Sequence, residues 1–381
     1  MDKQERLLDV VILDDLSPQM LEKVVVFFNS EFSPLNSKPM DQEFFKTKFR
    51  QVDSLQQGFL TIATYQDKVV GTCSAVRKKI HFQGRTIDAI EIGDTYTSTA
   101  FRRDCHFRKL FAGTSDFNDY LNRSVFGRLV SETLDRAAAN GANFVYGVPN
   151  EQSRVPYVGR LNFELIDADS TYRISSPTPT HPSIQKNLFL QILYKIYYDL
   201  TFYLSLYIAR KYEVKPAKDF SVLSENTLSS TYANDSEYLQ LSASKKWLET
   251  RFTKNTDKSY KIFHITNKKS SEVCGFLIYT IQSRKDGFRL LIKSKEFLFA
   301  KDLGRLTLPL SRIATYKFFE VENLSMWVDK KLTNRTQQLL FGYISRPIRV
   351  EIVAKRLKND LNRQQEISRF YNFQYGDSDL G

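Results

Sequence analysis

The chain has 381 residues, of which 42% are hydrophobic and 26% charged, so it has the composition of a globular protein with room for two or three domains. Its three cysteines are scattered and lack CxxC spacing, which argues against a disulfide framework and a structural zinc site. The net charge of +12 permits anionic partners, but the basic residues are spread along the chain and no nucleic-acid-binding motif is present. We therefore expect no nucleic-acid partner.

The first residues predict a cytoplasmic protein. The stretch MDKQERLLDVVILDDL carries acidic residues where a signal peptide needs a basic and then an apolar pattern. Within it, residues 9–14 read as a first strand. The next stretch has helical spacing, with Ser17 as a plausible N-cap and Pro18 at the first helical position. A second short helix is expected after Asp41.

Residues 58–174 predict extended runs interrupted by two helices. A hairpin over 58–82 turns at Asp67, and a third extended run follows Gly84. The spacing of apolar residues predicts a helix over 124–140 that stops at Asn140-Gly141. The remaining predicted elements are a short buried strand at 143–148, a turn and short helix at 149–161, and an extended run at 162–174.

Residues 176–218 predict a Pro-rich linker and a long apolar helix at 183–212. Polar residues recur every four positions in this helix, at Asn187, Gln191, Lys195 and Asp199, which indicates one narrow polar stripe. Three interpretations stay open, and we favour the first. The helix is buried between two domains, lies in a membrane interface, or spans the membrane.

Residues 219–381 predict a second α/β domain. Two β-rich runs, a long extended run, a helix and a short strand repeat the element order of the first domain at a period of roughly 200 residues. We therefore predict an α/β (α+β) fold in which two domains, 1–175 and 219–381, each contain a mixed, mostly antiparallel sheet flanked by helices. The long apolar helix joins them.

Residues 58–166 resemble the GNAT superfamily of acyl-CoA N-acyltransferases. The likeness depends on IGDTYTSTAFRR, SVFGRLVSETLDRAAANG, VYGVPNEQSRVPY and the terminal YGDSDL. The chain looks like the tandem-GNAT proteins of bacterial polysaccharide and cell-envelope loci. The resemblance implies an acyl-CoA co-substrate, most simply acetyl-CoA, and no metal. It implies a primary amine as acceptor, on an amino sugar of a surface polysaccharide or its precursor.

The resemblance also implies an Arg/Gln-x-x-Gly-x-Gly/Ala loop that binds the CoA diphosphate at a helix N-terminus, where backbone N–H groups are free. Two alignments are possible, and neither has the first glycine. One places the loop at Arg102 and Arg103 and needs a helix from 104 to 140. The other, which we prefer, treats 104–123 as an insertion. It aligns the loop with Ser124, Val125, Phe126 and Gly127, surrounded by Arg102, Arg103 and Arg123.

The same resemblance assigns the catalytic groups. Tyr157 is placed to protonate the thiolate of CoA, and backbone N–H groups near Thr97 are placed to bind the carbonyl oxygen. Asn150 and Ser153 would line the pantetheine arm. Glu91 and Asp94 compete as the base that takes the proton of the amine. They face opposite sides of a strand unless a bulge at Gly93 intervenes, and we favour Glu91 with Asp94 orienting the site.

Some choices stay open at this stage. The acceptor could instead be a peptide, a polyamine or a drug-like amine. A catalytically lapsed GNAT that serves as a scaffold is the rival from another class. The basic charge and the helix at 183–212 permit peripheral contact with the inner face of a membrane. The carboxyl-terminal GDSDLG could enter the site or fray.

Overall fold

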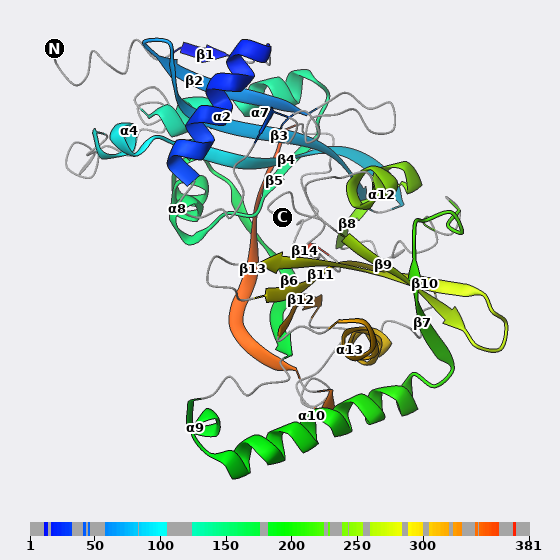
Figure 1. The fold of residues 1–381 in the computed structure, drawn as a ribbon. Helices are drawn as coiled ribbons and strands as arrows, with labels where there is room; N and C mark the ends of the chain where they lie inside the picture. Colours follow the sequence, from blue (N-terminus) through cyan, green and yellow to red (C-terminus); the bar gives the residue numbers. More distant parts are fainter. Residues whose placement is uncertain are drawn as a thin grey trace.

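Two lobes make up the computed structural model of the chain (Figure 1). The structure describes residues 11–13, 17–32, 41–42, 45, 58–82, 84–104, 124–175, 182–224, 228, 238–242, 244–253, 260–283, 289–299, 305–319, 323–329, 340–341, 343–357 and 369–370. The segment from 105 to 123, most of the predicted short helix after Asp41, and the carboxyl-terminal GDSDLG lie outside these residues.

An antiparallel meander forms the first lobe, as predicted. Its strands are β2 (Phe59–Tyr65), β3 (Lys68–Phe82) and β4 (Arg85–Thr97), and the short β1 (Val11–Leu13) pairs with β2. Gln66 and Asp67 join β2 to β3 with φ angles of 47° and 63°. Two successive positive φ angles are what a two-residue hairpin turn requires, because its twist then matches that of the strands.

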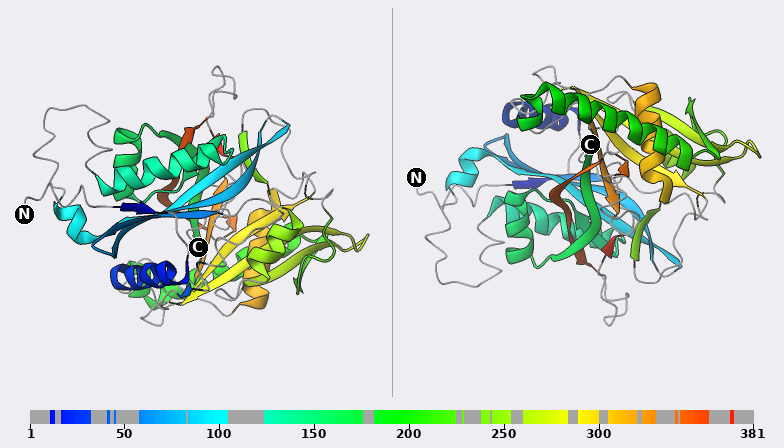
Figure 2. Two further views of the ribbon diagram at one scale, coloured as in Figure 1. Left: turned by 90° about the horizontal axis from the view of Figure 1, so that it is seen from above. Right: turned by 90° about the horizontal axis from the view of Figure 1, so that it is seen from below.

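Helices cover both faces of this meander (Figure 2). Helix α2 (Pro18–Phe32) begins where the Ser17 hydroxyl accepts a hydrogen bond from the Met20 N–H at 3.3 Å. It packs its apolar residues against Leu60 and Ile62 on one face of the sheet. Helix α7 (Val125–Ala139) packs on the opposite face. The sheet is thus covered on both sides, which explains the runs of consecutive buried residues in its strands.

The second lobe repeats the element order of the first. Strands β9 (Tyr260–Asn267), β10 (Val273–Ser283) and β11 (Arg289–Leu298) form a meander that helix α13 (Thr307–Phe318) and strand β12 (Asn323–Asp329) follow. Strand β12 runs parallel to β11, as β5 (Phe144–Gly147) runs parallel to β4. Strand β7 (Tyr212–Ala217) pairs with the outer side of β9.

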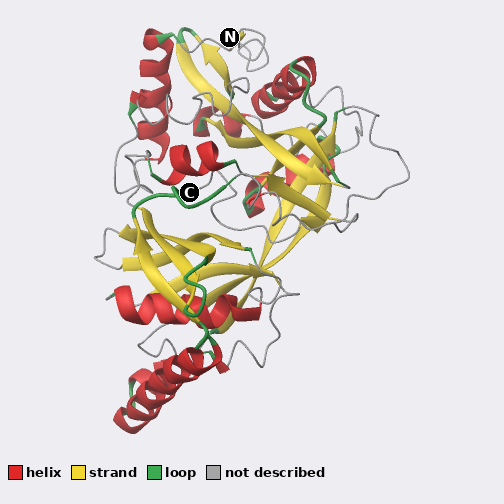
Figure 3. Cartoon of the chain, turned by 90° about the vertical axis from the view of Figure 1, so that its right-hand side faces the viewer, coloured by secondary structure: helices red, strands yellow, loops and turns green. Residues whose placement is uncertain are grey.

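The two lobes exchange strands where they meet (Figure 3). Strand β13 (Ile344–Arg356), from the end of the chain, lies antiparallel between β5 and β6 (Glu164–Ser175). Strand β6 also pairs with β12 of the second lobe. The hydrogen-bonded path is therefore continuous across the molecule. The predicted fold class is confirmed, whereas the domain limits at 175 and 219 stay a prediction.

Short elements complete the described chain. They are α4 (Thr99–Asp104), α8 (Glu151–Arg160), α9 (Pro182–Gln185), β8 (Tyr238–Ser242), α12 (Lys245–Phe252) and β14 (Arg369–Phe370). Strand β8 pairs with the far end of β3, so a segment between β7 and β9 of the second lobe also contributes to the sheet of the first lobe.

The long apolar helix lies elsewhere than predicted. Helix α10 (Leu188–Ile208) packs on α13 at the outer side of the second lobe (Figure 1). The prediction that this helix is buried between the two domains was therefore wrong. Only Tyr198, Thr201, Phe202 and Ser205 are buried, because α13 covers a single face. Among the described helices, none combines the length and the hydropathy needed to cross a membrane.

Candidate active site

A β-bulge interrupts strand β4 at the position that the sequence left open. Thr72 of β3 pairs with Tyr96, but Ser74 pairs with Gly93, so β4 carries one extra residue between them. Asp94 adopts a φ of 42°, in the left-handed region, and its carbonyl accepts a hydrogen bond from the Thr72 hydroxyl at 2.9 Å. The bulge changes which face of the sheet the next side chains occupy.

The bulge lies where β4 and β5 separate. The two strands pair only over residues 89–91 and 144–146. At Gly147, a Cβ atom would lie 3.0 Å from the Ile92 carbonyl oxygen, so the two strands are still in close contact there. Strand β5 then ends, whereas β4 continues to Thr97. Along this side, no described strand pairs with β4 beyond Glu91. Backbone N–H and C=O groups at such an opening are available to an extended ligand.

Two buried hydroxyl groups flank the bulge. Thr97 is 6% exposed and Ser74 is fully buried, and neither hydroxyl has a hydrogen-bond partner among the described residues. Ser74 lies directly against the bulge, because a Cβ on Gly93 would be 3.4 Å from its oxygen. Buried polar atoms usually find a partner. These two hydroxyls therefore fit a site whose ligand supplies that partner.

Tyr157 reaches the bulge from helix α8. The helix begins at Asn150, whose side chain accepts a hydrogen bond from the Ser153 N–H at 2.8 Å. Two turns later the Tyr157 hydroxyl lies 2.8 Å from Thr95 Oγ1, and the side chain is only 4% exposed. Its ring packs edge-on against Phe126, at the start of α7, with centroids 5.3 Å apart. The Tyr157 hydroxyl, a possible proton donor, thus lies between the bulge of β4 and the start of α7.

Helix α7 presents its N-terminus at the same place. Ser124 has an extended backbone and its hydroxyl accepts a hydrogen bond from the Gly127 N–H at 3.2 Å, so the helix begins at Val125. A single helix running from 104 to 140 is therefore wrong, because α7 begins at Val125. The assignment of the diphosphate loop to Ser124–Gly127 stays a prediction. The first turn has no acidic residue. Its backbone N–H groups and positive dipole end can receive a phosphate.

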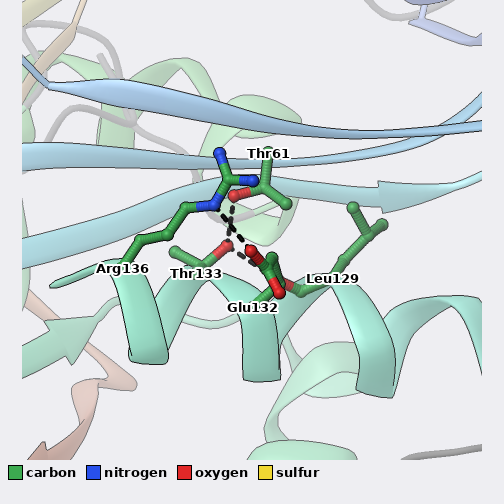
Figure 4. Close-up of polar contacts among 5 residues, drawn as sticks. All are labelled: Thr61, Leu129, Glu132, Thr133 and Arg136. Carbon is green, nitrogen blue, oxygen red and sulfur yellow. Dashed lines mark hydrogen bonds and ion pairs between the residues drawn. The ribbon is translucent and has the colours of Figure 1, made fainter. Parts of the chain in front are cut away.

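Packing fixes α7 against the meander. A Cβ on Gly71 of β3 would lie 2.8 Å from Leu129 and 3.2 Å from Val125, so the glycine lets the helix approach. Further along, Thr133 Oγ1 lies 2.8 Å from Thr61 Oγ1 and 2.7 Å from the Leu129 carbonyl oxygen (Figure 4). On the same helix, Arg136 pairs with Glu132 at 2.8 Å. The N-terminus of α7 is thereby held at a fixed position beside β4.

Glu91 lies on the other face of the sheet from Tyr157. Its carboxylate is 3.2 Å from Lys78 Nζ and accepts a long hydrogen bond from the Tyr146 hydroxyl at 3.4 Å. Both charged side chains are about 5% exposed or less. Tyr146 belongs to the core cluster opposite α7. The structure thus separates Glu91 from Tyr157 by the thickness of the sheet and gives the acid a buried cationic partner.

Some predicted site residues lie outside this description. Arg102 and Arg103 fall in α4, but their side chains, like all of Arg123, are outside the described residues. Sequence reasoning missed Thr95, which lies in the bulge, and Ser74 and Lys78, since only the strand register brings Ser74 to the bulge and Lys78 to Glu91. It also missed Glu31 of α2, which accepts hydrogen bonds from Tyr96 and Thr99 at 2.9 and 3.2 Å.

A buried thiol lies behind the site. Cys73 Sγ is 3.4 Å from Thr95 Oγ1, the atom that Tyr157 also contacts. Burial raises the pKa of the Cys73 thiol to about 11, against smaller opposing effects of hydrogen bonds with Thr133 and Thr95. The thiol is therefore protonated at neutral pH and acts as a packing group. Within the described part of the chain, no cluster of His, Cys, Asp and Glu could hold a metal ion.

The fold and this strand opening define the class of protein. The last strand of the meander bulges, and a helix that begins at the opening and a short parallel strand follow it. The GNAT resemblance implied such a helix N-terminus for the diphosphate of CoA. Residues 18–166 match the family described as an acetyltransferase (GNAT) domain. This match over the first lobe supports an N-acyltransferase enzyme. A comparison with curated protein sequences gave no significant match.

Solved structures share this fold over nearly the whole chain. A GCN5-related N-acetyltransferase from Anabaena variabilis is 11% identical, with a TM-score of 0.54, and the match covers 92% of this chain and 73% of that protein. A probable N-acyltransferase from Enterococcus faecalis is 9% identical, with a TM-score of 0.55 and coverage of 92% and 72%. Saccharomyces cerevisiae N-myristoyltransferase with bound myristoyl-CoA is 10% identical, with a TM-score of 0.52 and coverage of 91% and 82%. These likenesses show that both lobes belong to one GNAT-like fold.

Proposed function

We propose that the chain transfers an acyl group, most simply acetyl, from CoA to a primary amine at the opening between β4 and β5. The observation that carries this proposal is the Tyr157 hydroxyl, which lies 2.8 Å from Thr95 Oγ1 between the β4 bulge and the start of α7. A thioester at this opening would have a proton donor for its leaving sulfur. It would also have backbone N–H donors for its carbonyl oxygen.

In this proposal, the residues around the opening have different roles in binding and catalysis. The first turn of α7, beginning at Ser124, receives the diphosphate, and Arg102, Arg103 and Arg123 add positive charge. The β4 edge up to Thr97 holds the extended arm of the thioester, while Asn150 and Ser153 border it from α8. Tyr157 gives a proton to the departing thiolate. In this proposal the carbonyl oxygen is held by N–H groups of β4, so that its growing negative charge is stabilised.

In this proposal, Glu91 is the base that takes the proton of the acceptor amine. Its carboxylate is on the face of the sheet opposite Tyr157, so an amine that approaches from that face would meet Glu91 rather than Tyr157. Asp94, in its strained conformation, sets the direction of the β4 backbone at the bulge. We assign the acceptor to amino sugars of a bacterial surface polysaccharide or its precursor, on the strength of the family resemblance alone.

The test measures release of free CoA thiol by the purified full chain with acetyl-CoA and a panel of amines. The panel holds amino sugars, peptides and polyamines, and the class with the highest kcat/KM identifies the acceptor. Ser124→Asp keeps a good N-cap but adds a negative charge where the diphosphate is expected, and Ser124→Asn is the matched neutral control. We expect Ser124→Asp to raise the KM for acetyl-CoA at least about tenfold, and Ser124→Asn to change it less than about threefold. The proposal would be overturned if none of the amines increased the rate of thiol release above the rate without amine. Equal KM values of the two variants for acetyl-CoA would also overturn it.

A further inference from the structure

Helix α10 has two faces of different character. Its buried residues, Tyr198, Thr201, Phe202 and Ser205, lie on one side, against α13. On the opposite side, large apolar residues are exposed along its entire length. They are Leu188, Phe189, Leu190, Ile192, Leu193, Ile196, Tyr197, Leu200, Tyr203, Tyr207 and Ile208, with exposed fractions between 37% and 72%. Twenty-one helical residues span about 30 Å, so this apolar face is far longer than a chance cluster.

The interface with α13 fixes which face points outward. Arg312 of α13 is fully buried, and its guanidinium lies 3.2 Å from the centroid of the Tyr198 ring. The same side chain donates hydrogen bonds to Thr201 Oγ1 at 3.2 Å and to the Tyr198 carbonyl at 2.6 Å. Phe202 stacks on Tyr316 at 3.9 Å. These contacts hold α10 in one rotation, so its apolar face stays directed away from the protein.

Charge around this face is positive. Lys186, Lys195, Arg210 and Lys211 are all exposed, whereas Asp199 is the one acidic residue from 182 to 212. Asp199 is turned toward α13, where its carboxylate accepts a hydrogen bond from the Tyr316 hydroxyl at 3.3 Å. Arg210 lies 4.7 Å from the Tyr207 ring centroid, at the end of the apolar face. A basic rim around an apolar helix face matches an anionic lipid headgroup layer above acyl chains.

We propose that α10 docks this chain on the surface of a membrane that contains anionic phospholipid. The helix lies in the plane of the interface with its apolar face in the acyl boundary. Tyr197, Tyr203 and Tyr207 can keep their hydroxyl groups among the headgroups. Lys186 just before the helix, Lys195 within it and Arg210 just after it supply the positive charge for the anionic phosphates. The GNAT site is on the other lobe, so this surface is independent of the acyl-transfer proposal.

The test is cosedimentation of the full chain with vesicles of phosphatidylcholine alone or with about a third phosphatidylserine. We expect binding to the anionic vesicles at least about tenfold stronger than to the neutral ones, weakening as salt is added. Phe189→Gln/Ile196→Gln/Leu200→Gln removes the centre of the apolar face but keeps helix-forming residues, and should lower binding at least about tenfold.

A matched control removes exposed apolar residues elsewhere. Val26→Gln/Val222→Gln/Leu340→Gln changes three side chains of similar exposure that are not on α10, and should bind vesicles like the unchanged chain. Circular dichroism checks that each variant is folded. Equal binding by both triple variants, or no binding of the unchanged chain to anionic vesicles, would overturn the proposal. So would sedimentation velocity showing a dimer that the α10 variant alone dissociates, since a second copy would then cover this face.

Discussion

The two lobes carry the same strand bulge with different residues around it. In the first lobe, β4 has one extra residue between its pairs with Thr72 and Ser74 of β3. In the second lobe, Ile278 and Tyr279 of β10 pair with Lys295 and Lys293, so β11 also has one extra residue. Strand β12 pairs with β11 only over 290–292, immediately before the bulge, as β5 does with β4. A bulged strand beside a short parallel strand is therefore present in both lobes.

The chemistry differs between the two copies. Helix α7 begins with Ser124 capping Gly127, whereas α13 begins after Leu306 with no side-chain cap. Tyr157 stands seven residues after Asn150, and Phe341 stands seven residues after Asn334. Phe341 is buried in the core cluster that contains α13 residues. Phenylalanine keeps the packing of the ring but has no proton to donate, so the second lobe retains the fold without the donor.

Buried lysines also distinguish the second bulge. Lys293 and Lys295 are 1% and 7% exposed, on either side of the extra residue Ser294, where the first lobe has Gly93 and Thr95 around Asp94. The same backbone arrangement thus carries different residues in the two lobes, with Gly93 and a hydroxyl group near the bulge of the first lobe and two buried lysines at that of the second.

The largest expected effect comes from exchanging the two aromatic residues. Tyr157→Phe removes the proton donor and should lower kcat about 10²- to 10⁴-fold, the usual contribution of general acid catalysis. Phe341→Tyr should neither raise kcat nor restore the Tyr157→Phe variant. Steady-state thiol release gives both values. Recovery of turnover in the double variant would show that the second lobe is a working site.

A stability effect should follow from removing Lys78. Lys78→Met leaves the buried Glu91 carboxylate without its ion-pair partner and should lower the free energy of unfolding by about 3 kcal/mol. The double variant Lys78→Met/Glu91→Leu should recover most of this loss. Lys23→Met is the exposed control, because its partner Asp67 is 83% exposed and the pair should contribute less than about 1 kcal/mol. Urea unfolding measures all three, and an equal loss in Lys78→Met and Lys23→Met would contradict the buried pair.

Asp94 should act through its backbone conformation. Asp94→Gly removes the cost of a φ of 42° and should change the free energy of unfolding by less than about 0.5 kcal/mol, whereas Asp94→Ala should lower it by about 1 kcal/mol. We expect Asp94→Gly to keep kcat within about threefold, while Glu91→Gln lowers it about 10²-fold if Glu91 takes the amine proton. The opposite order of kcat losses would make Asp94 the base.

The smallest effect concerns Cys73. With a pKa raised to about 11 by burial, its thiolate fraction at pH 8 is only ~0.1%, so alkylation should be slow until the pH approaches 11. Mass spectrometry of a Cys105→Ser/Cys274→Ser chain treated with iodoacetamide measures this directly. Fast labelling of the folded chain at pH 8 would mean that the face behind Thr95 is open to solvent.

Local sequence patterns predicted most of the elements but not their partners. The N-cap Ser17 was predicted because capping is a short-range interaction, and so was the hairpin at Asp67. The insertion of β13 between β5 and β6 was not, since strand pairing over about 200 residues leaves no local pattern. The exposure of α10 was missed for a related reason. Its sequence is apolar on nearly all sides, which indicates burial, and only the packing on α13 shows how little is covered.

For the candidate site, too, local features were predicted and long-range contacts were not. Tyr157 and Ser124 were placed at the opening by spacing and family resemblance, and the structure brings them together with β4. The ion pair between Glu91 and Lys78 was invisible, because the two residues are neighbours only through the register of β3 and β4.

Calorimetric titration of the full chain with acetyl-CoA tests the central claim most directly, since the claim is that one bulge of two is a working thioester site. We predict saturation at one molecule per chain with micromolar affinity, equivalent to a binding free energy of about −8 kcal/mol. We also predict that Ser124→Asp abolishes most of this binding. Saturation at two molecules per chain, or no heat of binding at millimolar acetyl-CoA, would contradict the account.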